Sequence, residues 1–328
     1  MGKDNIGIQV SIIIPVFKAK DFIIDCLKAV SSQTFTGSIE CLLIDDCGGD
    51  NSIVLAEEYI ASCDYNIDFV VLRQEYNQGP SAARNRGIRE AKGEYVFFLD
   101  ADDVISPDCI ELLYSLAKQY NLDYVQGMYH SDEHYQMPVY KSEDCNILIN
   151  DRKVIKKNLL NYTYIPFTPH NRLVRRQFLL EHNLFFPEKI KVREDFYWMF
   201  FVAKCVERMA LCNKETYFRG YNGESLTHNI NKEREILAYR TLIEDFCVNI
   251  DPFMKGEQKA LILDTLLIAI RGNYFENEIS KKKMISIFMQ YNVGIEKIML
   301  RLLFLLGEGT LKSKLLHLLL RSYKQKNI

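Results

Sequence analysis

Three carboxylates stand together in a short run after an apolar stretch of the sequence. Asp100, Asp102 and Asp103 directly follow the residues Tyr95–Leu99. Carboxylates at the end of a buried segment must be solvated, paired with a basic side chain or bound to a metal ion. Their oxygens suit Mg²⁺ or Mn²⁺, which proteins usually share with substrate phosphates. The run indicates a divalent-cation site, with helix capping as the alternative, which we favour for Asp103 alone.

A second acidic cluster, residues 45–50, follows another apolar stretch and includes Asp45 and Asp46. The sequence has no Gly-x-x-x-x-Gly-Lys-[Ser/Thr] motif, and no Gly-x-Gly-x-x-Gly follows its first apolar run. Both motifs bind phosphates, so their absence argues against a P-loop NTPase and a dinucleotide-binding dehydrogenase. A nucleotide could instead be held by this acidic loop while a cation binds the diphosphate.

These clusters must be positioned by the elements that precede them. The first hundred residues alternate apolar runs with segments of helical periodicity, which predicts an α/β fold with a mainly parallel central sheet and helices on both faces. In such sheets ligands bind outside the carboxyl ends of the strands, where both acidic clusters lie. The expected strands are Val10–Val16, Ile39–Ile44, Phe69–Leu72 and Tyr95–Leu99, and the expected helices are Asp21–Val30, Ser52–Ile60 and Ser81–Ala91.

After Glu224 the sequence predicts helix nearly throughout, so we expect an α/β domain at residues 1–226 and a helical domain at residues 227–328. In the mixed region before that boundary, helices are expected over Arg175–Asn183 and Asp195–Val206. Hydrophobic residues make up 48% and charged residues 26%, which is typical of a globular protein. The formal net charge of -2 argues against a nucleic-acid partner. No apolar run reaches the roughly 20 residues that cross a bilayer.

The cysteines and the N-terminus predict a cytoplasmic protein. Nine cysteines are scattered without a Cys-x-x-Cys motif, which favours reduced thiols over a disulfide framework. Residues 1–9 contain no apolar segment of the kind that signal peptides carry.

Four motifs occur in a fixed order over the first hundred residues, and together they resemble family 2 glycosyltransferases of the GT-A fold. The resemblance continues more loosely to about residue 226 and says little about the remainder. The motifs are Val10-Ser-Ile-Ile-Ile-Pro-Val-Phe17, Leu43-Ile-Asp-Asp46 with Asp50-Asn-Ser52, Asn77-Gln-Gly-Pro-Ser-Ala-Ala-Arg-Asn-Arg-Gly87, and Phe98-Leu-Asp-Ala-Asp-Asp103.

The resemblance implies a role for each matching residue on the donor side. Pro15 and Phe17 would lie against the nucleotide base, and Asp46 would bond the uracil. Gly79 and Arg84 would close over the ribose and sugar of the donor.

The resemblance also assigns the acidic run. Asp100, Ala101 and Asp102 match the family's Asp-x-Asp motif in the donor site. Asp102 would be the direct ligand of Mg²⁺ or Mn²⁺, and Asp100 would bond the ribose or the metal. His228 is a further candidate ligand of the cation or the diphosphate, with a surface histidine as the alternative.

A later Glu-Asp pair, Glu194 and Asp195, stands where family members carry the catalytic base. The resemblance implies that Asp195 removes the acceptor's hydroxyl proton as its oxygen attacks the anomeric carbon. The alternative is an acidic pair favoured by the helix dipole. Glu194 and Trp198 are acceptor-side candidates, with a buried core position as the alternative for Trp198.

The resemblance implies inverting, metal-dependent transfer of a sugar from a nucleotide sugar, first among them a UDP-hexose. The acceptor would be a hydroxyl of a glycan or a lipid-linked oligosaccharide, and the product a β-glycoside. A non-catalytic nucleotide-sugar or glycan binder is one alternative. A nucleotidyltransferase is another, although residues 16–19 are not the Gly-rich basic loop it would need. The sequence gives no indication of an oligomeric state.

The C-terminal region is basic, since residues 281–328 hold ten Lys/Arg and two Asp/Glu. Within it, Ile298–Ile328 alternates Leu-rich segments with Lys and Arg. Such segments suit a helix lying on an anionic membrane, here the inner face of the cell membrane. The alternative is a helical pair on the catalytic domain with a solvated basic face.

Overall fold

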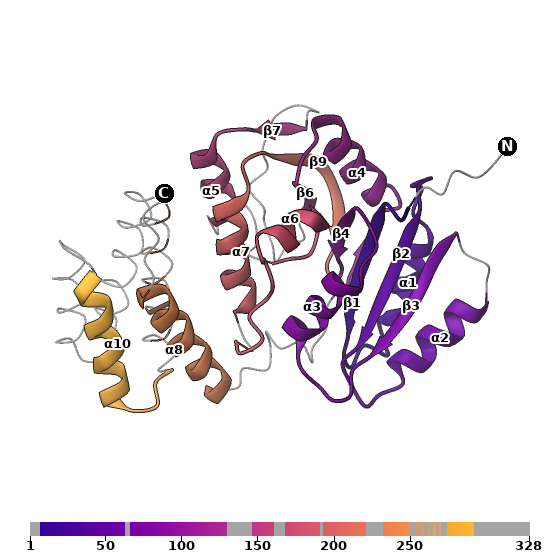
Figure 1. Cartoon of the computed structure of the whole chain (residues 1–328). Helices are drawn as coiled ribbons and strands as arrows, with labels where there is room; N and C mark the ends of the chain where they lie inside the picture. The colour runs from indigo at the N-terminus through magenta and orange to yellow at the C-terminus, as the bar shows by residue number, and fades with distance from the viewer. Residues whose placement is uncertain are drawn as a thin grey trace. The chain divides into compact units, whose positions relative to one another are not determined.

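A computed structural model gives the architecture of the chain (Figure 1). It describes residues 7–62, 66–129, 146–160, 168–190, 193–220 and 232–248, residues 254, 258, 262, 265, 266 and 269, and residues 274–291. The chain divides into two compact units, Met1–Ser225 and Leu226–Ile328. No helix among the described residues is both long enough and apolar enough to span a bilayer.

The first unit begins with four parallel strands, as the apolar runs predict. They are β1 (Val10–Val16), β2 (Ile39–Asp45), β3 (Ile67–Arg73) and β4 (Tyr95–Phe98). β1 pairs with both β2 and β4, so it is central, and its nearly continuous burial follows from being covered on both faces. Pro15 lies beyond the last β1–β4 pair, Ile13 with Phe98, where a missing N–H costs no β4 ladder bond.

Helices connect these strands and cover the sheet on both faces (Figure 1). Helix α1 buries one apolar stripe, and α3 begins with Pro80 in its first turn, where no intrahelical N–H bond is lost. The connecting helices are α1 (Ile23–Ser31), α2 (Ser52–Ser62) and α3 (Pro80–Glu90), followed further along the chain by α4 (Cys109–Tyr120).

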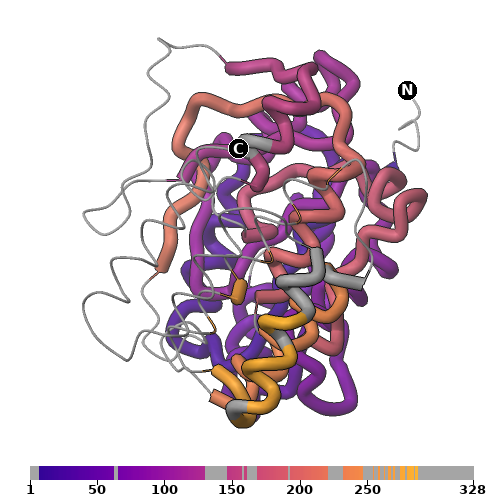
Figure 2. Tube along the Cα trace, turned by 90° about the vertical axis from the view of Figure 1, so that its left-hand side faces the viewer, coloured from indigo at the N-terminus to yellow at the C-terminus, as the bar shows by residue number. Residues whose placement is uncertain are grey.

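Later segments return to the same sheet, where β8 (Arg172–Arg175) lies beside β4 (Figure 1). Figure 2 shows the chain trace turned by 90°. In the described part of the chain the sheet has nine strands in the order β3-β2-β1-β4-β8-β6-β9-β5, with β7 paired to β9. The pairs of β8 with β4 and with β6 are antiparallel. The added strands are β5 (Val104–Ile105), β6 (Tyr124–Tyr129), β7 (Ile147–Ile149), β8 (Arg172–Arg175) and β9 (Met209–Phe218).

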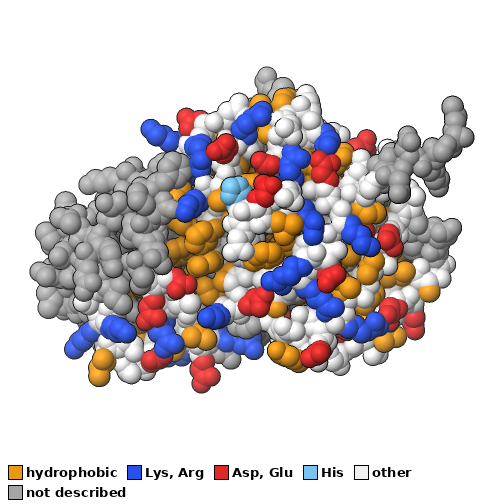
Figure 3. All heavy atoms as spheres, in the orientation of Figure 1, with side chains coloured by type: hydrophobic (Ala, Val, Ile, Leu, Met, Phe, Trp, Pro, Cys, Tyr) orange, Lys and Arg blue, Asp and Glu red, His pale blue; other side chains and the backbone are white. Residues whose placement is uncertain are grey.

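Three further helices complete the described first unit: α5 (Arg152–Leu160), α6 (Arg176–Glu181) and α7 (Glu194–Cys205). The expected helix from Arg175 therefore starts one residue later, because Arg175 is the last residue of β8. Over the face shown in Figure 3, basic and acidic side chains are intermixed. The described residues visible there do not gather into a patch of one sign.

The described residues of the second unit are mainly helical. Among them are the helices α8 (Lys232–Val248) and α10 (Glu278–Tyr291). Tyr239 of α8 stacks on Tyr274 with ring centroids 5.5 Å apart, and Arg240 forms an ion pair with Glu276. These contacts join α8 to the segment that leads into α10.

Candidate functional site

The acidic run follows β4 at the edge of the sheet formed by the carboxyl ends of β1, β2 and β4. Asp100 and Asp102 are partly exposed, whereas Ala101 and Asp103 are buried. The chain after β9 crosses this run closely, because a Cβ on Gly220 would lie 1.8 Å from the Asp102 carbonyl oxygen. Only glycine fits there without movement of the backbone.

The centre of the site is the guanidinium group of Arg84, which is 5% exposed. It comes from α3, and its Nη2 lies 3.0 Å from Asp100 Oδ1. Its Nη1 lies 3.3 Å from Glu194 Oε1 and 3.4 Å from Asp195 Oδ1. The Arg84 guanidinium thus joins the acidic run after β4 to the acidic pair at the start of α7. Whether Arg84 also contacts the donor, as its motif implies, stays a prediction.

This arrangement separates the pKa values of the three carboxyls. Burial opposes the ionisation of Asp100, but Arg84 and His170 outweigh it and hold its pKa well below the usual range. Burial raises the pKa of Glu194, only partly offset by Arg84. Burial, followed by the charge of Glu194, raises the pKa of Asp195 well above its ordinary value. A carboxyl with a raised pKa and a 25% exposed side chain is suited to accept a proton.

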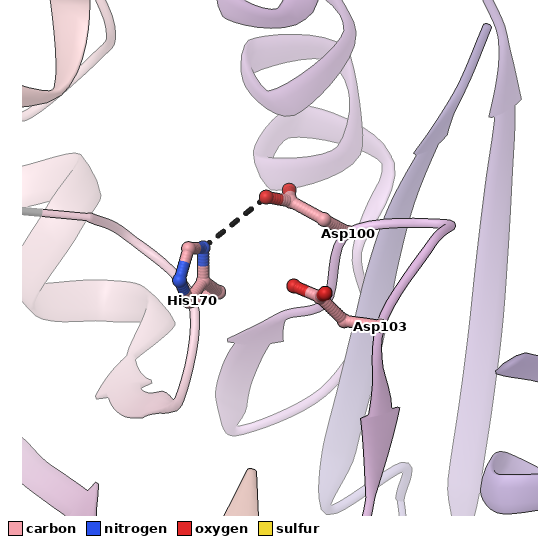
Figure 4. A group of neighbouring side chains, drawn as sticks. All are labelled: Asp100, Asp103 and His170. Atoms are coloured by element: carbon pink, nitrogen blue, oxygen red, sulfur yellow. Dashed lines mark ion pairs between the residues drawn. The ribbon is translucent and has the colours of Figure 1, made fainter. Parts of the chain in front are cut away.

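The residues around Asp100 fit a divalent cation. Three carboxylates share one guanidinium, so the cluster is rich in negative charge. Ligand atoms of Asp100, Asp103 and His170 lie within 4.8 Å of one another, and Figure 4 shows them facing each other. Carboxylate oxygens are the ligands that Mg²⁺ and Mn²⁺ prefer. Asp102 as the direct ligand stays a prediction.

The expectation that Asp103 caps the following helix was wrong. Its Oδ2 accepts a 2.6 Å hydrogen bond from the Tyr217 hydroxyl and its Oδ1 a 2.8 Å bond from the Gly220 N–H. The antiparallel pairing of β5 with β9 brings Tyr217 to this carboxyl, whereas α4 begins only at Cys109. Burial, reinforced by Asp100, raises the pKa of Asp103 to about 7.

His170 is a site residue that the sequence analysis missed. Its Nδ1 lies 3.2 Å from Asp100 Oδ2, and its ring stacks on Tyr217 with centroids 4.8 Å apart. Burial lowers the pKa of His170 to about 4, so the ring is neutral at pH 7. A single histidine before β8 carries no local signal, because its partner Asp100 lies 70 residues earlier in the chain.

Asp46 is held within its own loop. It is 2% exposed, and its two carboxylate oxygens accept hydrogen bonds from four donors of the turn that precedes α3. A uracil ring that bonded Asp46 would have to replace the hydrogen bond from the Gln74 or the Asn77 side-chain amide. The role of Asp46 in bonding uracil stays a prediction. The donors are Gln74 Nε2, Asn77 Nδ2 and the N–H groups of Gln78 and Gly79.

The other donor-side residues lie at the same edge of the sheet. Pro15 is near the end of β1, and Phe17, just beyond it, is 43% exposed. Gly79 precedes α3 with φ of 89°, a conformation that favours glycine. Arg84 is five residues further along that helix, so α3 links the Asp46 turn to the acidic site. Contact of Pro15, Phe17, Gly79 and Ala101 with a donor stays a prediction.

Trp198 is a core residue, and its candidate role as an acceptor platform was wrong. It is 1% exposed, its ring stacks on Phe186 with centroids 4.6 Å apart, and its Nε1 donates to the Leu184 carbonyl oxygen. Phe98 of β4 also meets the indole ring, with centroids 5.7 Å apart, so the buried ring leaves no face for a sugar. Glu194 is also buried, but its Oε1 faces Arg84, and its acceptor-side role stays a prediction.

We expect Trp198→Phe to lower the free energy of unfolding by about 1–3 kcal/mol, since it removes a buried ring edge and one hydrogen bond. The KM for an acceptor should not change. Urea unfolding and acceptor titrations measure the two effects. A raised acceptor KM without lost stability would contradict the core assignment.

Two expectations from the sequence lie outside the described residues. They are His228 as a further ligand and the membrane-binding segment 298–328.

Known glycosyltransferases resemble this chain in sequence over part of their length. Poly(ribitol-phosphate) beta-glucosyltransferase of Bacillus spizizenii is 27% identical over 215 residues, which are 62% of this chain and 34% of that protein. The uncharacterized glycosyltransferase EpsJ of Bacillus subtilis is 30% identical over 220 residues, 66% of this chain and 62% of EpsJ. The chain thus matches less than two thirds of either relative's length.

Solved structures share the fold. TarS of S. aureus, residues 1–349 in complex with UDP-GlcNAc, aligns with a TM-score of 0.69 at 19% identity, covering 97% of this chain and 92% of that one. Mannosyltransferase PcManGT from Pyrobaculum calidifontis, in complex with GDP-Man and Mn²⁺, aligns with a TM-score of 0.57 at 13% identity, covering 97% and 86%. The family pattern described as glycosyl transferase family 2 matches residues 11–182, more than half of the chain. The protein therefore belongs to glycosyl transferase family 2.

Proposed function

We propose that this protein is an inverting, metal-dependent glycosyltransferase that moves a sugar from a UDP-sugar to a hydroxyl of a glycan or lipid-linked oligosaccharide. The observation that carries the proposal is the position of Arg84, whose guanidinium lies 3.0 Å from Asp100 and 3.4 Å from Asp195. It brings a carboxylate of the Asp-x-Asp run and a carboxyl with a raised pKa into one site.

Asp195 would act as the base. Its carboxylate would accept the proton of the acceptor hydroxyl while the hydroxyl oxygen forms the new bond to the anomeric carbon. The bond from that carbon to the diphosphate breaks on the opposite face, so an α-linked donor gives a β-glycoside. Asp195 needs to be deprotonated for this step, and the neighbouring Arg84 supports its charged form.

Asp102 and Asp100 would hold Mg²⁺ or Mn²⁺, which offsets the charge on the departing diphosphate when bound. Two solved structures of the same fold support one choice each, TarS the UDP-sugar and PcManGT the cation. The TarS structure contains UDP-GlcNAc, and the PcManGT structure contains GDP-Man and Mn²⁺. The Bacillus spizizenii relative is named for glucosyl transfer to poly(ribitol phosphate), which makes a poly(ribitol phosphate) chain a candidate acceptor.

A panel of UDP-sugars with Mn²⁺ tests the proposal, with UDP release as the measurement. We expect slow hydrolysis of one UDP-sugar, accelerated by a matching acceptor. Asp102→Asn should reduce UDP release by about 100-fold or more, because it removes a charged ligand of the cation. Asp108→Asn, outside the site, is the matched control.

Two results would overturn the proposal. Binding of a UDP-sugar without UDP release, both alone and with every acceptor tested, would favour a non-catalytic nucleotide-sugar binder. Equal losses in Asp102→Asn and Asp108→Asn would remove the assigned cation site.

A further inference from the structure

His170 completes the set of groups around Asp100, and by distance alone it looks like a metal ligand. Its ring is 4% exposed, and Nδ1 points toward the Asp100 carboxylate (Figure 4). In this structure Nδ1 lies 3.2 Å from Asp100 Oδ2, although its hydrogen is not well aligned on that oxygen. The other ring nitrogen decides what Nδ1 can do.

Arg219 fixes the position of the ring proton. Its Nη2 lies 3.1 Å from His170 Nε2. A guanidinium group can only donate hydrogen bonds, so Nε2 must accept and carries no proton. The proton of the neutral ring therefore resides on Nδ1. A metal ion on Nδ1 would require that proton to leave and would place an Nε2 proton against the Arg219 donor.

We propose that His170 is a positioning residue for Asp100 and not a ligand of the cation. Its Nδ1–H faces Asp100 Oδ2 across 3.2 Å, while Arg84 Nη2 donates to Oδ1 at 3.0 Å. Groups on both sides of the carboxylate therefore restrict its plane. Asp100 would thereby face a bound cation in one orientation.

The surroundings of the ring favour a fixed position. One face of His170 stacks on Tyr217 at an interplanar angle of 16°, and Tyr129 meets the ring edge-on with centroids 5.5 Å apart. Tyr217 in turn donates to Asp103, and Tyr129 donates to the His170 carbonyl oxygen at 2.6 Å. The ring is therefore enclosed by side chains that are themselves hydrogen-bonded within the site.

The tautomer can be measured without any substrate. In protein labelled with ¹⁵N-histidine, His170 should show a protonated Nδ1 and an unprotonated Nε2, and Arg219→Met should weaken this preference. In electron spin echo envelope modulation of protein saturated with Mn²⁺, the wild type should show no histidine-nitrogen coupling that is lost in His170→Leu, a comparison that leaves any coupling from His228 unchanged. A protonated Nε2, or a nitrogen of His170 coordinated to Mn²⁺, would overturn the proposal.

Two variants test the effect on catalysis, which rests on the proposed function. His170→Leu removes the donor and should reduce kcat/KM and Mn²⁺ affinity by about 10–100-fold. His170→Asn keeps an N–H near the place of Nδ1 and should restore most of the loss. The exposed residue His182 supplies the control pair His182→Leu and His182→Asn.

The two variants also separate positioning from packing. If Asn and Leu at position 170 lose activity equally and in proportion to lost stability, the positioning role is wrong. If the wild-type protein has no transferase activity, the proposed function fails, and the tautomer and Mn²⁺ spectra still decide the role of His170.

Discussion

Asp195→Asn is expected to reduce turnover by about 10²–10⁴-fold, the usual contribution of a positioned general base. The amide keeps the size of the side chain but cannot take the acceptor's proton. Donor affinity should change little, because Asp100 and the Asp46 turn remain intact. The measurement is steady-state kcat with donor and acceptor, together with calorimetric titration of the donor alone. Full turnover by Asp195→Asn would remove the assigned base.

Glu194, next to Asp195, offers a matched control variant that should change the pH–rate profile more than the maximal rate. Glu194→Gln should retain more activity than Asp195→Asn, but it should shift the acidic limb of the pH–rate profile. Because Asp195 must be deprotonated to act, the rate falls as pH drops through its raised pKa. The charge of Glu194 contributes to that raised value, so its removal should move the limb to lower pH. An unmoved limb would show that the titrating group is not Asp195.

Arg84→Met is expected to lower the free energy of unfolding by about 3–5 kcal/mol at pH 8, because it leaves buried carboxylates without their cation. The loss should be visible in urea unfolding followed by the fluorescence of Trp198, the only tryptophan. Arg86→Met on the same helix is the control. Its side chain donates to the Arg73 carbonyl oxygen and faces none of the three acids, so we expect a loss below about 1 kcal/mol.

The loss of stability in Arg84→Met should depend on pH in a definite direction. Without Arg84, the folded-state pKa values of Glu194 and Asp195 rise further above their unfolded values. Such groups destabilise the fold most where the unfolded state is ionised, above the ordinary carboxyl pKa. The deficit of Arg84→Met should therefore shrink as pH is lowered from 8 toward 5. Adding Glu194→Gln should recover part of it at pH 8. A deficit that does not depend on pH would indicate lost packing on Phe186 instead.

The part of the fold built from local signals could be predicted from the sequence. The four runs that end in Val16, Asp45, Arg73 and Phe98 are strands with the expected order, since apolar runs alternate there with helical periodicity. The strands β8 and β9 could not be predicted in this way. β8 pairs antiparallel to β4, about 80 residues earlier in the chain, and β9 pairs parallel to β6, about 85 residues earlier. The sequence pattern even makes Arg175 the first residue of an expected helix.

The same distinction applies to the site. The acidic run and the Glu194-Asp195 pair are visible as motifs, but nothing local shows that Arg84 joins them. Asp103 failed as a predicted cap because its true partner, Tyr217, arrives from a strand 114 residues later. The sequence allowed Trp198 to be either an acceptor-side residue or a core residue, because helical periodicity does not show which aromatic rings pack against it. Long-range packing decides each of these cases.

The four hydrogen bonds onto Asp46 bear on the thermodynamics of donor recognition. They order the turn from Gln74 to Gly79 when the chain folds, with a buried carboxylate as the anchor. The conformational entropy of that turn is therefore already lost before a nucleotide arrives. Donor association should then be rapid and lack a slow phase of loop ordering. Asp46→Ala, by releasing the turn, should introduce that slow phase along with a less favourable binding entropy.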